Sequence, residues 1–312
     1  MISFVDIVIV NWNSGLFLKN CIESIKKFHS TSEVRIYIYD NASSDGSLDF
    51  AMADPDVHII YGSTNAGFGA ACNRAAECGS SKYILFLNPD TEVFSDSIRK
   101  PCEFLENDVD ADYGVASVMM IDQQGRINQN VEKIRSVAML IAQSFGVEKL
   151  LAMMRSTSAI DPYKSDNVEH VIGAFYLIRR DLFERLGGFD ERFFVYFEDM
   201  DLSYRVSKLG ISKRYLADVT AFHRENGTSD QIRAMRLFYF SRSKILFSFK
   251  HFNVVLASCI LLATLFVEPF LRMAKALILR SRRQFEEVVT GFALLWKDLP
   301  NIFRNIRKHR SS

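Results

Sequence analysis

The sequence of 312 residues has few cysteines, almost no net charge and no internal repeat. Its five cysteines are odd in number, and no two of them form a C-x-x-C pair. Because most of them fall at apolar positions of predicted helices, we expect reduced thiols in a cytosolic protein rather than a disulfide framework. The N-terminus also lacks a basic region followed by a long apolar run, so we expect no secretory signal.

The net charge of +1 hides an uneven distribution along the chain. Residues 269–312 contain ten lysines and arginines against three acidic residues, a net charge of +7, which leaves −6 for residues 1–268. A basic tail behind an acidic body favours a negatively charged surface as the partner of the tail. The hydrophobic content of 48% is that of a globular chain with a substantial core.

The first hundred residues alternate between strand and helix patterns. The apolar run VDIVIV predicts a strand over 5–10 that is covered on both faces, apart from Asp6. Further strands are predicted at 34–40, 57–61 and 82–87, with helices at 18–25, 46–53, 68–78 and 95–106. This alternation predicts an α/β fold with a mainly parallel central sheet, right-handed crossovers and flanking helices.

The pattern loosens beyond residue 110. Strands are predicted at 113–121 and 171–180, and two short strands near 213–222. A helix ends at Gly210, and a long amphipathic helix is expected from about Gln231 to Phe249. The chain therefore divides into a predicted catalytic domain at 1–228 and a helical C-terminal region at 229–312.

Each of the first four predicted strands ends in a polar element. These elements are Asn11-Trp12-Asn13, Asp40-Asn41, Asn65-Ala66-Gly67-Phe68-Gly69 and Asn88-Pro89-Asp90. Any one of them has the composition of an ordinary turn. In an open parallel sheet, however, all four would line the edge beyond the carboxyl ends of the strands, where such folds bind ligands.

The residue types at this edge suit a nucleotide with a diphosphate. Asp40 can accept hydrogen bonds from a nucleobase N–H or a ribose hydroxyl. Asp90 would repel a diphosphate unless Mg²⁺ or Mn²⁺ lay between them. Asn65 and Gly67 precede a helix whose free N–H groups favour anions. A dinucleotide-binding loop is a weaker interpretation, because GFGAAC has Cys72 in place of the third glycine and follows the third strand.

The sequence resembles the inverting GT-A glycosyltransferases of family 2, and within them the bacterial rhamnosyltransferase-like branch, which acts on lipid-linked or cell-surface glycans. The resemblance covers roughly residues 4–228. Six segments carry it in the family's order: VDIVIVNWN, DNASSDGS, NAGFGAACNRA, LFLNPD, GGFDERFFVYFEDMDLSYRV and FHREN. It implies a GT-A, or nucleotide-diphospho-sugar transferase, fold.

The resemblance also implies roles for individual residues. Asp40 would read the base with Asn11 near it, and Asp90 would be the metal-binding acid of the D-x-D element. The first acid of that element is Asn88 in this chain, which brings no charge to a cation. His223 would be the second metal ligand, although a histidine after Ala-Phe is by itself more often structural. The residues expected to bind the nucleotide sugar are Asn11, Asn13, Asp40, Asn65, Gly67, Asn88 and Asp90.

Inversion at an anomeric carbon needs a base that deprotonates the acceptor hydroxyl as it attacks. The family's base lies in an E-D element, which Glu198-Asp199 matches here. We expect Asp199 to be the base, and Glu198 to contact the acceptor or orient the following helix. The competing interpretation is that Asp199 only caps that helix.

The C-terminal region contains FNVVLASCILLATLFV, residues 252–267. As a helix this run would extend roughly 24 Å, short of the roughly 30 Å hydrocarbon layer. We therefore expect a hairpin or in-plane helices that bind anionic headgroups, which makes the protein peripheral or monotopic on the cytoplasmic side of the cell membrane. A buried helix or a contact within a homo-oligomer is the alternative. No nucleic-acid recognition module is visible.

Taken together, the sequence predicts the transfer of a sugar, with rhamnose the first choice, in cell-surface polysaccharide synthesis. The donor would be deoxythymidine-diphosphate rhamnose or a uridine-diphosphate sugar, and the acceptor a glycan or a lipid-linked glycan. The alternative is a catalytically silent subunit that binds sugar nucleotides or glycans within a membrane assembly complex, which the loss of charge at Asn88 would permit.

Overall fold

The computed structural model describes residues 5–108, 110, 112–147, 161–224 and 233–310. The chain forms two compact units, which we call the sheet unit and the helical unit. The sheet unit comprises Met1–Ile134, Ile160–Glu191 and Glu198–Thr228, and the helical unit comprises Arg135–Ala159, Arg192–Phe197 and Ser229–Ser312. The predicted division into 1–228 and 229–312 stays a prediction.

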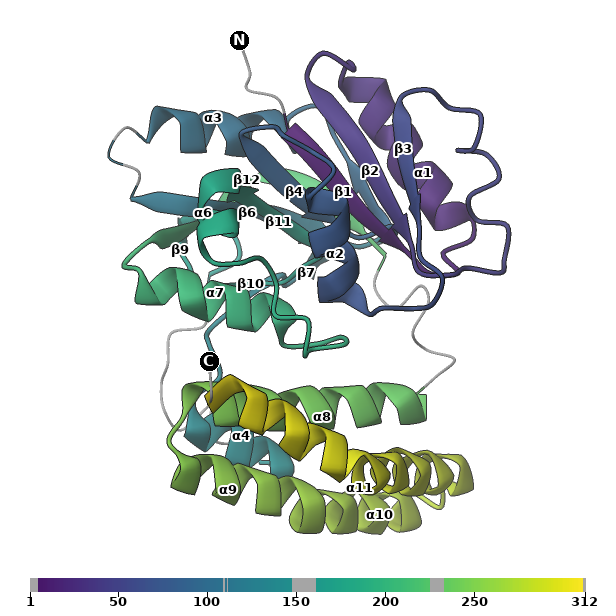
Figure 1. Cartoon of the computed structure of the whole chain (residues 1–312), viewed down its shortest axis with the longest axis vertical. Helices are drawn as coiled ribbons and strands as arrows, with labels where there is room; N and C mark the ends of the chain where they lie inside the picture. The colour runs from purple at the N-terminus through teal and green to yellow at the C-terminus, as the bar shows by residue number, and fades with distance from the viewer. Residues whose placement is uncertain (1–4, 109, 111, 148–160, 225–232, 311–312) are drawn as a thin grey trace. The chain divides into compact units, whose positions relative to one another are not determined.

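The sheet unit is built around one mostly parallel sheet (Figure 1). Its strands run in the order β3-β2-β1-β4-β11-β6-β12-β5, with β7 on β6 and β9 on β12. Their bounds are β1 Val5–Asn11, β2 Val34–Asp40, β3 Val57–Tyr61, β4 Tyr83–Leu87, β5 Thr91–Val93, β6 Tyr113–Ile121, β7 Ile127–Asn128, β9 Asp166–Asn167, β11 Phe175–Arg179 and β12 Ser212–His223. A second, two-stranded sheet pairs β8 Val131–Glu132 with β10 His170–Val171.

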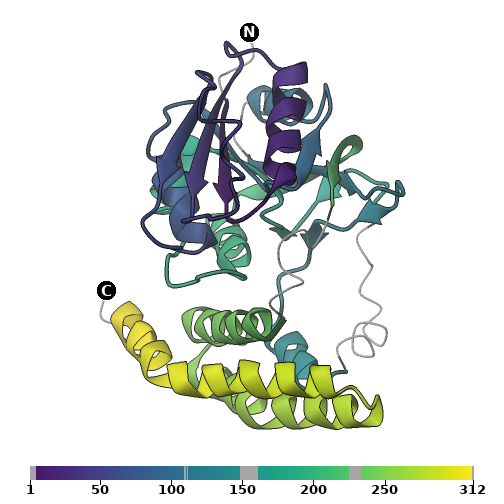
Figure 2. The ribbon, with the colours of Figure 1, turned by 90° about the vertical axis from the view of Figure 1, so that its right-hand side faces the viewer.

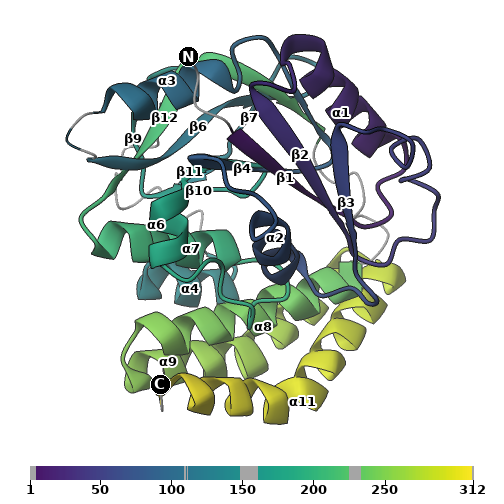
Figure 3. The same cartoon turned by 45° about the horizontal axis from the view of Figure 1, so that its top comes forward.

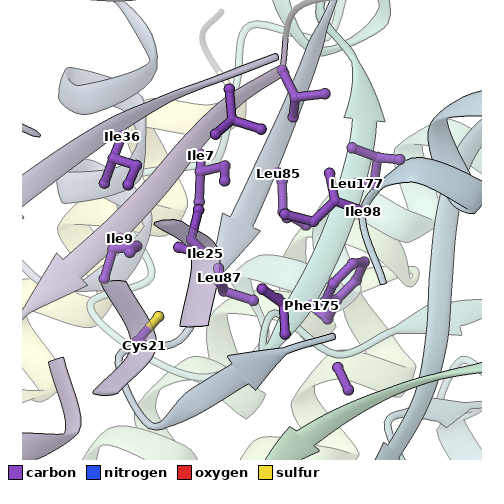
Figure 4. Close-up of a cluster of buried hydrophobic side chains, with 14 of the residues drawn as sticks. Ile7, Ile9, Cys21, Ile25, Ile36, Leu85, Leu87, Ile98, Phe175 and Leu177 are labelled. Carbon is purple, nitrogen blue, oxygen red and sulfur yellow. The ribbon is translucent and has the colours of Figure 1, made fainter. Parts of the chain in front are cut away.

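Helices cover both faces of the large sheet (Figure 3). They are α1 Leu16–Phe28, α2 Phe68–Ala76, α3 Arg99–Asn107, α6 Arg180–Arg185 and α7 Glu198–Lys208. Apolar residues of α1 and α3 pack on one face, where Cys21 and Ile25 meet Ile7 and Leu85 (Figure 4). Residues of α2, α6 and α7 pack on the other face. Burial on both faces explains why the central strands read as continuous apolar runs.

The helical unit consists of α4 Val137–Ser144, α8 Arg233–His251, α9 Val254–Leu262, η2 Ala263–Val267, α10 Glu268–Ile278 and α11 Arg282–Arg310. Helix α8 packs against α9 and α11, and α10 packs against α11 (Figure 2). Residues Arg192–Phe197 also belong to this unit, because Phe194 stacks on Tyr239 of α8 at 4.4 Å between ring centroids. The predicted helix start near Gln231 lies outside the described residues.

Two local predictions are wrong. Residues 46–53 form successive turns, with hydrogen bonds from the N–H of Asp49 to Gly46 O and from that of Ala51 to Leu48 O. Asp45 accepts from the N–H of Ser47, and such local bonds compete with helix formation. The two short strands expected near 213–222 are one strand, β12, with a register shift between Leu216 and Thr220.

Candidate active site

The carboxyl ends of β1, β2 and β4 lie at one edge of the sheet. Asn11 and Asp40 are register partners there, and Asn11 Nδ2 donates a 2.8 Å hydrogen bond to Asp40 Oδ1. The same nitrogen lies 3.0 Å from Ser43 Oγ and 2.9 Å from Ser47 Oγ. Both members of the pair are buried, and Asn11 Oδ1 has no partner among the described residues. A bound ligand that donates to this oxygen would satisfy it.

The loop after β2 is fixed to the loop after β1. Asn13 Oδ1 accepts from the N–H of Ser44 at 2.8 Å, and the N–H of Asn13 donates to Ser43 Oγ at 3.0 Å. Asp45 Oδ2 accepts from the N–H of Gly15 at 2.8 Å. Asn13 is therefore a link between two loops at this edge. Sequence reasoning missed Ser43 and Asp45, whose residue types indicated only a turn.

The glycine loop before α2 is held by Asn41. Asn41 Oδ1 accepts from the N–H of Ala66 at 3.0 Å, and Asn41 Nδ2 donates to Gly67 O at 3.2 Å. Asn65 Oδ1 accepts from the N–H of Gly67, which has a φ of 87°. No side chain caps α2 at Gly67. The first-turn N–H groups of α2 are thus available to an anion, and the sequence identified Asn41 only as the neighbour of Asp40.

Asp90 and His223 come together at the same edge. His223 ends β12 and is paired with Thr91 of β5. Its Nε2 atom lies 3.3 Å from Asp90 Oδ1, each side chain is 13% exposed, and its Nδ1 atom lies 3.1 Å from Asn128 Nδ2. Within the described part of the chain, no group of three or more His, Cys, Asp or Glu side chains could hold a metal ion. The pair fits Mg²⁺ or Mn²⁺ when diphosphate oxygens and water supply the other ligands.

Asn88 is engaged through its main chain. Its N–H donates to Ala174 O, just before β11, at 3.1 Å, and its carbonyl accepts from the N–H of Thr91 at 3.1 Å. These bonds fix the turn that carries Asp90. The neutral side chain makes the two-ligand set at Asp90 and His223 the whole protein contribution that the sequence predicts for a cation.

Asp199 is joined to Asn88 through two neighbouring residues. Its Oδ2 atom accepts from the N–H of Gly173 at 2.9 Å, and Gly173 adjoins Ala174, the main-chain partner of Asn88. Its Oδ1 atom accepts from the N–H of Met200 at 2.7 Å, as the capping interpretation expects. The E-D element therefore lies beside the strand end that carries Asp90.

Glu198 is buried at the start of α7. The residue is 5% exposed, and Oε2 has no partner among the described residues. A Cβ atom on Gly69 would lie 3.5 Å from Glu198 Cβ, so the glycine allows the first turn of α2 to approach α7. Burial, and then the adjoining Asp199 charge, raises the pKa of the Glu198 carboxyl well above its ordinary value.

A cavity of about 350 Å³ lies elsewhere in the sheet unit. It is lined by residues of α2, α6 and the segment after α6, and it contains none of the sequence-predicted site residues. Its polar groups already have protein partners: Arg180 binds Asp6 at 2.6 Å, and Asn73 binds the main chain of Phe189. We therefore place the candidate site at the strand ends.

Comparison with known proteins gives consistent relatives. A family model described as "Glycosyl transferase family 2" matches residues 6–187. The N-acetylglucosaminyl-diphospho-decaprenol L-rhamnosyltransferase of Mycobacterium tuberculosis is 24% identical over 79% of this chain and 84% of its own length. Rhamnosyltransferase WbbL of Escherichia coli is 26% identical over 70% of this chain and 81% of its own length.

Solved structures share the fold at low sequence identity. The mannosyltransferase PcManGT from Pyrobaculum calidifontis, in complex with GDP-Man and Mn²⁺, has a TM-score of 0.56 at 15% identity, covering 100% of this chain and 87% of its own. S. aureus TarS 1–349 in complex with UDP-GlcNAc has a TM-score of 0.55 at 13% identity, covering 97% and 81%. The predicted GT-A fold, with its mainly parallel sheet, is confirmed.

Proposed function

The chain belongs to glycosyl transferase family 2, and from that premise we propose an inverting, cation-dependent transfer of a sugar from a nucleoside diphosphate to a glycan or lipid-linked acceptor. One observation carries the proposal. The Asn11–Asp40 pair, the Asp90–His223 pair and the Asp199 carboxylate occupy the ends of neighbouring strands and the segment bonded to them. Nucleotide, cation and base functions are thereby available at one edge.

The donor would lie across this edge. Asp40, oriented by Asn11, would accept from the base or ribose, and the uncapped start of α2 would bind phosphate oxygens. Asp90 and His223 would hold Mg²⁺ or Mn²⁺, whose positive charge offsets the charge that develops on the departing diphosphate. We propose rhamnose as the sugar, carried by deoxythymidine diphosphate, because two relatives are named rhamnosyltransferases. A uridine-diphosphate sugar is the second choice.

Asp199 would act as the base. The acceptor oxygen forms a bond to the anomeric carbon as the bond from that carbon to the diphosphate oxygen breaks. The acceptor's proton passes to Asp199, and the bonding electron pair leaves with the diphosphate. Main-chain bonds from Gly173 and Met200 hold the carboxylate, so its direction does not depend on a charged partner.

The test is turnover with a panel of sugar nucleotides, with and without Mn²⁺, followed by the anomeric configuration of the product. We expect cation-dependent transfer with inversion. Asn88 favours a second candidate, the silent binding subunit, because this position brings no charge to a cation. Calorimetric binding of nucleoside diphosphates with no turnover on any donor or acceptor would support that candidate instead.

We also propose that the helical unit binds the cytoplasmic surface of the membrane in plane. Among the described residues, one helical run, Val254–Ile278, is long and apolar enough to cross a membrane by length and composition alone. Glu268 in the middle of that run lies 2.6 Å from Lys244 Nζ of α8, and both side chains are buried. A spanning helix would separate this pair, at a cost of about 3–5 kcal/mol. The ion pair therefore supports an in-plane arrangement.

The membrane contact would be centred on the turn between α10 and α11. Leu277–Leu279 are exposed there, with Ile278 at 81%. Lys275, Arg280, Arg282 and Arg283 are exposed around them. Aliphatic side chains next to cations match a bilayer surface, where acyl chains lie beneath anionic phosphates. This charge complementarity favours a lipid surface over a second copy of the chain, which carries the same positive charge.

A further inference from the structure

Asn128 and Asp90 lie on opposite nitrogens of the His223 ring. Asn128 is the last residue of β7 and is paired with Met120 of β6. Its Nδ2 atom lies 3.1 Å from His223 Nδ1, and Asp90 Oδ1 lies 3.3 Å from His223 Nε2. The imidazole is therefore addressed by an amide on one side and by a carboxylate on the other.

The hairpin between β6 and β7 fixes the position of Asn128. Asp122 Oδ1 accepts from the N–H groups of Gln124 and Arg126, and Asp122 Oδ2 accepts from Arg126 Nε at 2.7 Å. The N–H of Asp122 also donates to Arg126 O. None of these bonds involves the sugar-nucleotide residues, so the amide is held beside the imidazole by the fold itself.

A neutral imidazole has one N–H, and its place depends on what the two nitrogens contact. In the contacts described above, Nε2–H donates to Asp90, and Nδ1 accepts from the Asn128 amide. A cation at Nε2 requires the lone pair of that atom, so the proton must lie on Nδ1. Nδ1–H then needs an acceptor, and Asn128 offers its Oδ1 atom when the amide turns over.

We propose that Asn128 is a positioning residue for the cation site, which selects the His223 tautomer whose Nε2 atom can bind a divalent cation. The proposal rests on the cation role of Asp90 and His223 in the proposed function. An asparagine serves both tautomers because it has a donor and an acceptor on one side chain. A leucine at this position serves neither, and an aspartate serves only the tautomer that binds the cation.

The test measures Mn²⁺ affinity directly, by electron paramagnetic resonance of free Mn²⁺ in the presence of uridine or deoxythymidine diphosphate. We expect Asn128→Leu to weaken Mn²⁺ binding about 10–100-fold, and Asn128→Asp to bind at least as tightly as the wild type. Gln129→Leu is the matched control, because Gln129 lies on the same hairpin and bonds Val131 O rather than His223. It should bind Mn²⁺ as the wild type does.

A double-mutant cycle separates tautomer selection from a change of charge or fold. With His223→Gln in the background, Asn128→Leu should have no further effect, and Asn128→Asp should show only its added charge. In ¹⁵N-histidine-labelled protein, Asn128→Asp should shift the His223 signals toward the Nδ1–H tautomer. Should Asn128→Leu bind Mn²⁺ like Gln129→Leu while His223→Gln binds weakly, the inference is wrong and the cation site stands. Unchanged binding in His223→Gln would instead overturn the cation site itself.

Discussion

Oδ2 of Asp199 accepts a 2.9 Å hydrogen bond from the backbone N–H of Gly173, and this bond ties the start of α7 to the segment before β11. A Cβ atom on Gly173 would lie 3.3 Å from the ring of Phe68 and 3.6 Å from the same carboxylate oxygen. The carboxylate, the main chain at Gly173 and the first residue of α2 are thus packed together. The direction of Asp199 is set by the fold before any substrate binds.

The first prediction follows from this arrangement. In Asp199→Asn the amide oxygen can still accept from Gly173, so the local fold should survive, but the side chain can no longer take a proton. Turnover should fall about 10²–10⁴-fold, while nucleoside diphosphate affinity stays near that of the wild type. Steady-state kinetics and calorimetry on the same preparation check this. Near-normal turnover would show that Asp199 is not the base.

Glu198→Gln should behave differently. The pKa of Glu198 is raised well above its ordinary value by burial and by Asp199, so the carboxyl holds its proton at pH values where an exposed glutamate has lost it. Because the folded-state pKa exceeds the unfolded one, this group makes the folded chain less stable as pH rises through that window. Glu198→Gln removes the decline and should cost little turnover. Urea unfolding across pH, with turnover alongside, tests both, and a loss as deep as in Asp199→Asn would make Glu198 the base.

Periodicity made most of the sheet predictable from the sequence. The strands at 5–10, 34–40 and 57–61 are buried or partly buried apolar runs bounded by turn residues, and the structure has them within one residue. The predicted helix at 46–53 is wrong, because side-chain bonds such as that of Asp45 to Ser47 replace helical ones. Short-range patterns do not report that competition.

The site was predictable in part for a related reason. Asn11 and Asp40 end adjacent parallel strands, so their meeting follows from the order of the strands. Pairing of His223 with Asp90 depends on β12 crossing to β5, and on a register shift within β12, which no local pattern encodes. Asn128 lies on a two-residue strand, too short for any periodicity to identify. Its contact with His223 could be found only in three dimensions.

Asp40 and Asn11 allow a swap experiment. Asp40→Asn leaves two amides facing each other, which should weaken both the fold and nucleotide binding, the latter about tenfold or more for each 1.4 kcal/mol lost. The double variant Asn11→Asp with Asp40→Asn restores a donor opposite an acceptor across the 2.8 Å contact. It should recover thermal stability but not nucleotide affinity, because the carboxylate now lies on β1. Recovery of both would show that Asp40 serves the fold rather than the base or ribose.

Lys213 offers a prediction on stability. The side chain is buried on β12, donates to Ser207 Oγ at 2.6 Å, and burial lowers its pKa to about 8. Between pH 8 and the ordinary lysine value near 10.5, the unfolded chain holds a proton that the folded chain has released. The free energy of unfolding should therefore rise with pH across that window, by about 3 kcal/mol.

Replacing Lys213 by methionine removes this buried charge. The variant should be more stable than the wild type at pH 7 by about 1–3 kcal/mol, and the difference should shrink as pH approaches 10.5. Urea unfolding of both proteins at several pH values measures it. A methionine variant that is less stable at every pH would mean that the bonds to the Ser203 carbonyl and the Ser207 hydroxyl outweigh the cost of burying the ammonium.

The α10–α11 turn gives the last prediction. Reversing charge in Arg282→Glu with Arg283→Glu should release the protein from anionic vesicles, since each cation contributes about 1 kcal/mol at such a surface. These arginines pair with Glu286 and Glu287 on an exposed helix face, where ion pairs contribute little to folding. Leu277→Ser with Ile278→Ser should weaken binding to anionic and neutral vesicles alike, because it removes apolar contact. Met52→Ser, an exposed apolar side chain of the sheet unit, is the control and should bind normally.

Vesicle flotation at low and high salt then separates the possible modes of attachment. An in-plane contact that depends on headgroup charge should be lost at high salt, because screening weakens the attraction of exposed cations for phosphates. Retention after alkaline carbonate extraction would instead mean that Val254–Ile278 crosses the bilayer, and Glu268 would then have left Lys244. Sedimentation without lipid distinguishes a second copy of the chain: a dimer that dissociates in Leu277→Ser with Ile278→Ser would assign this turn to self-association rather than to the membrane.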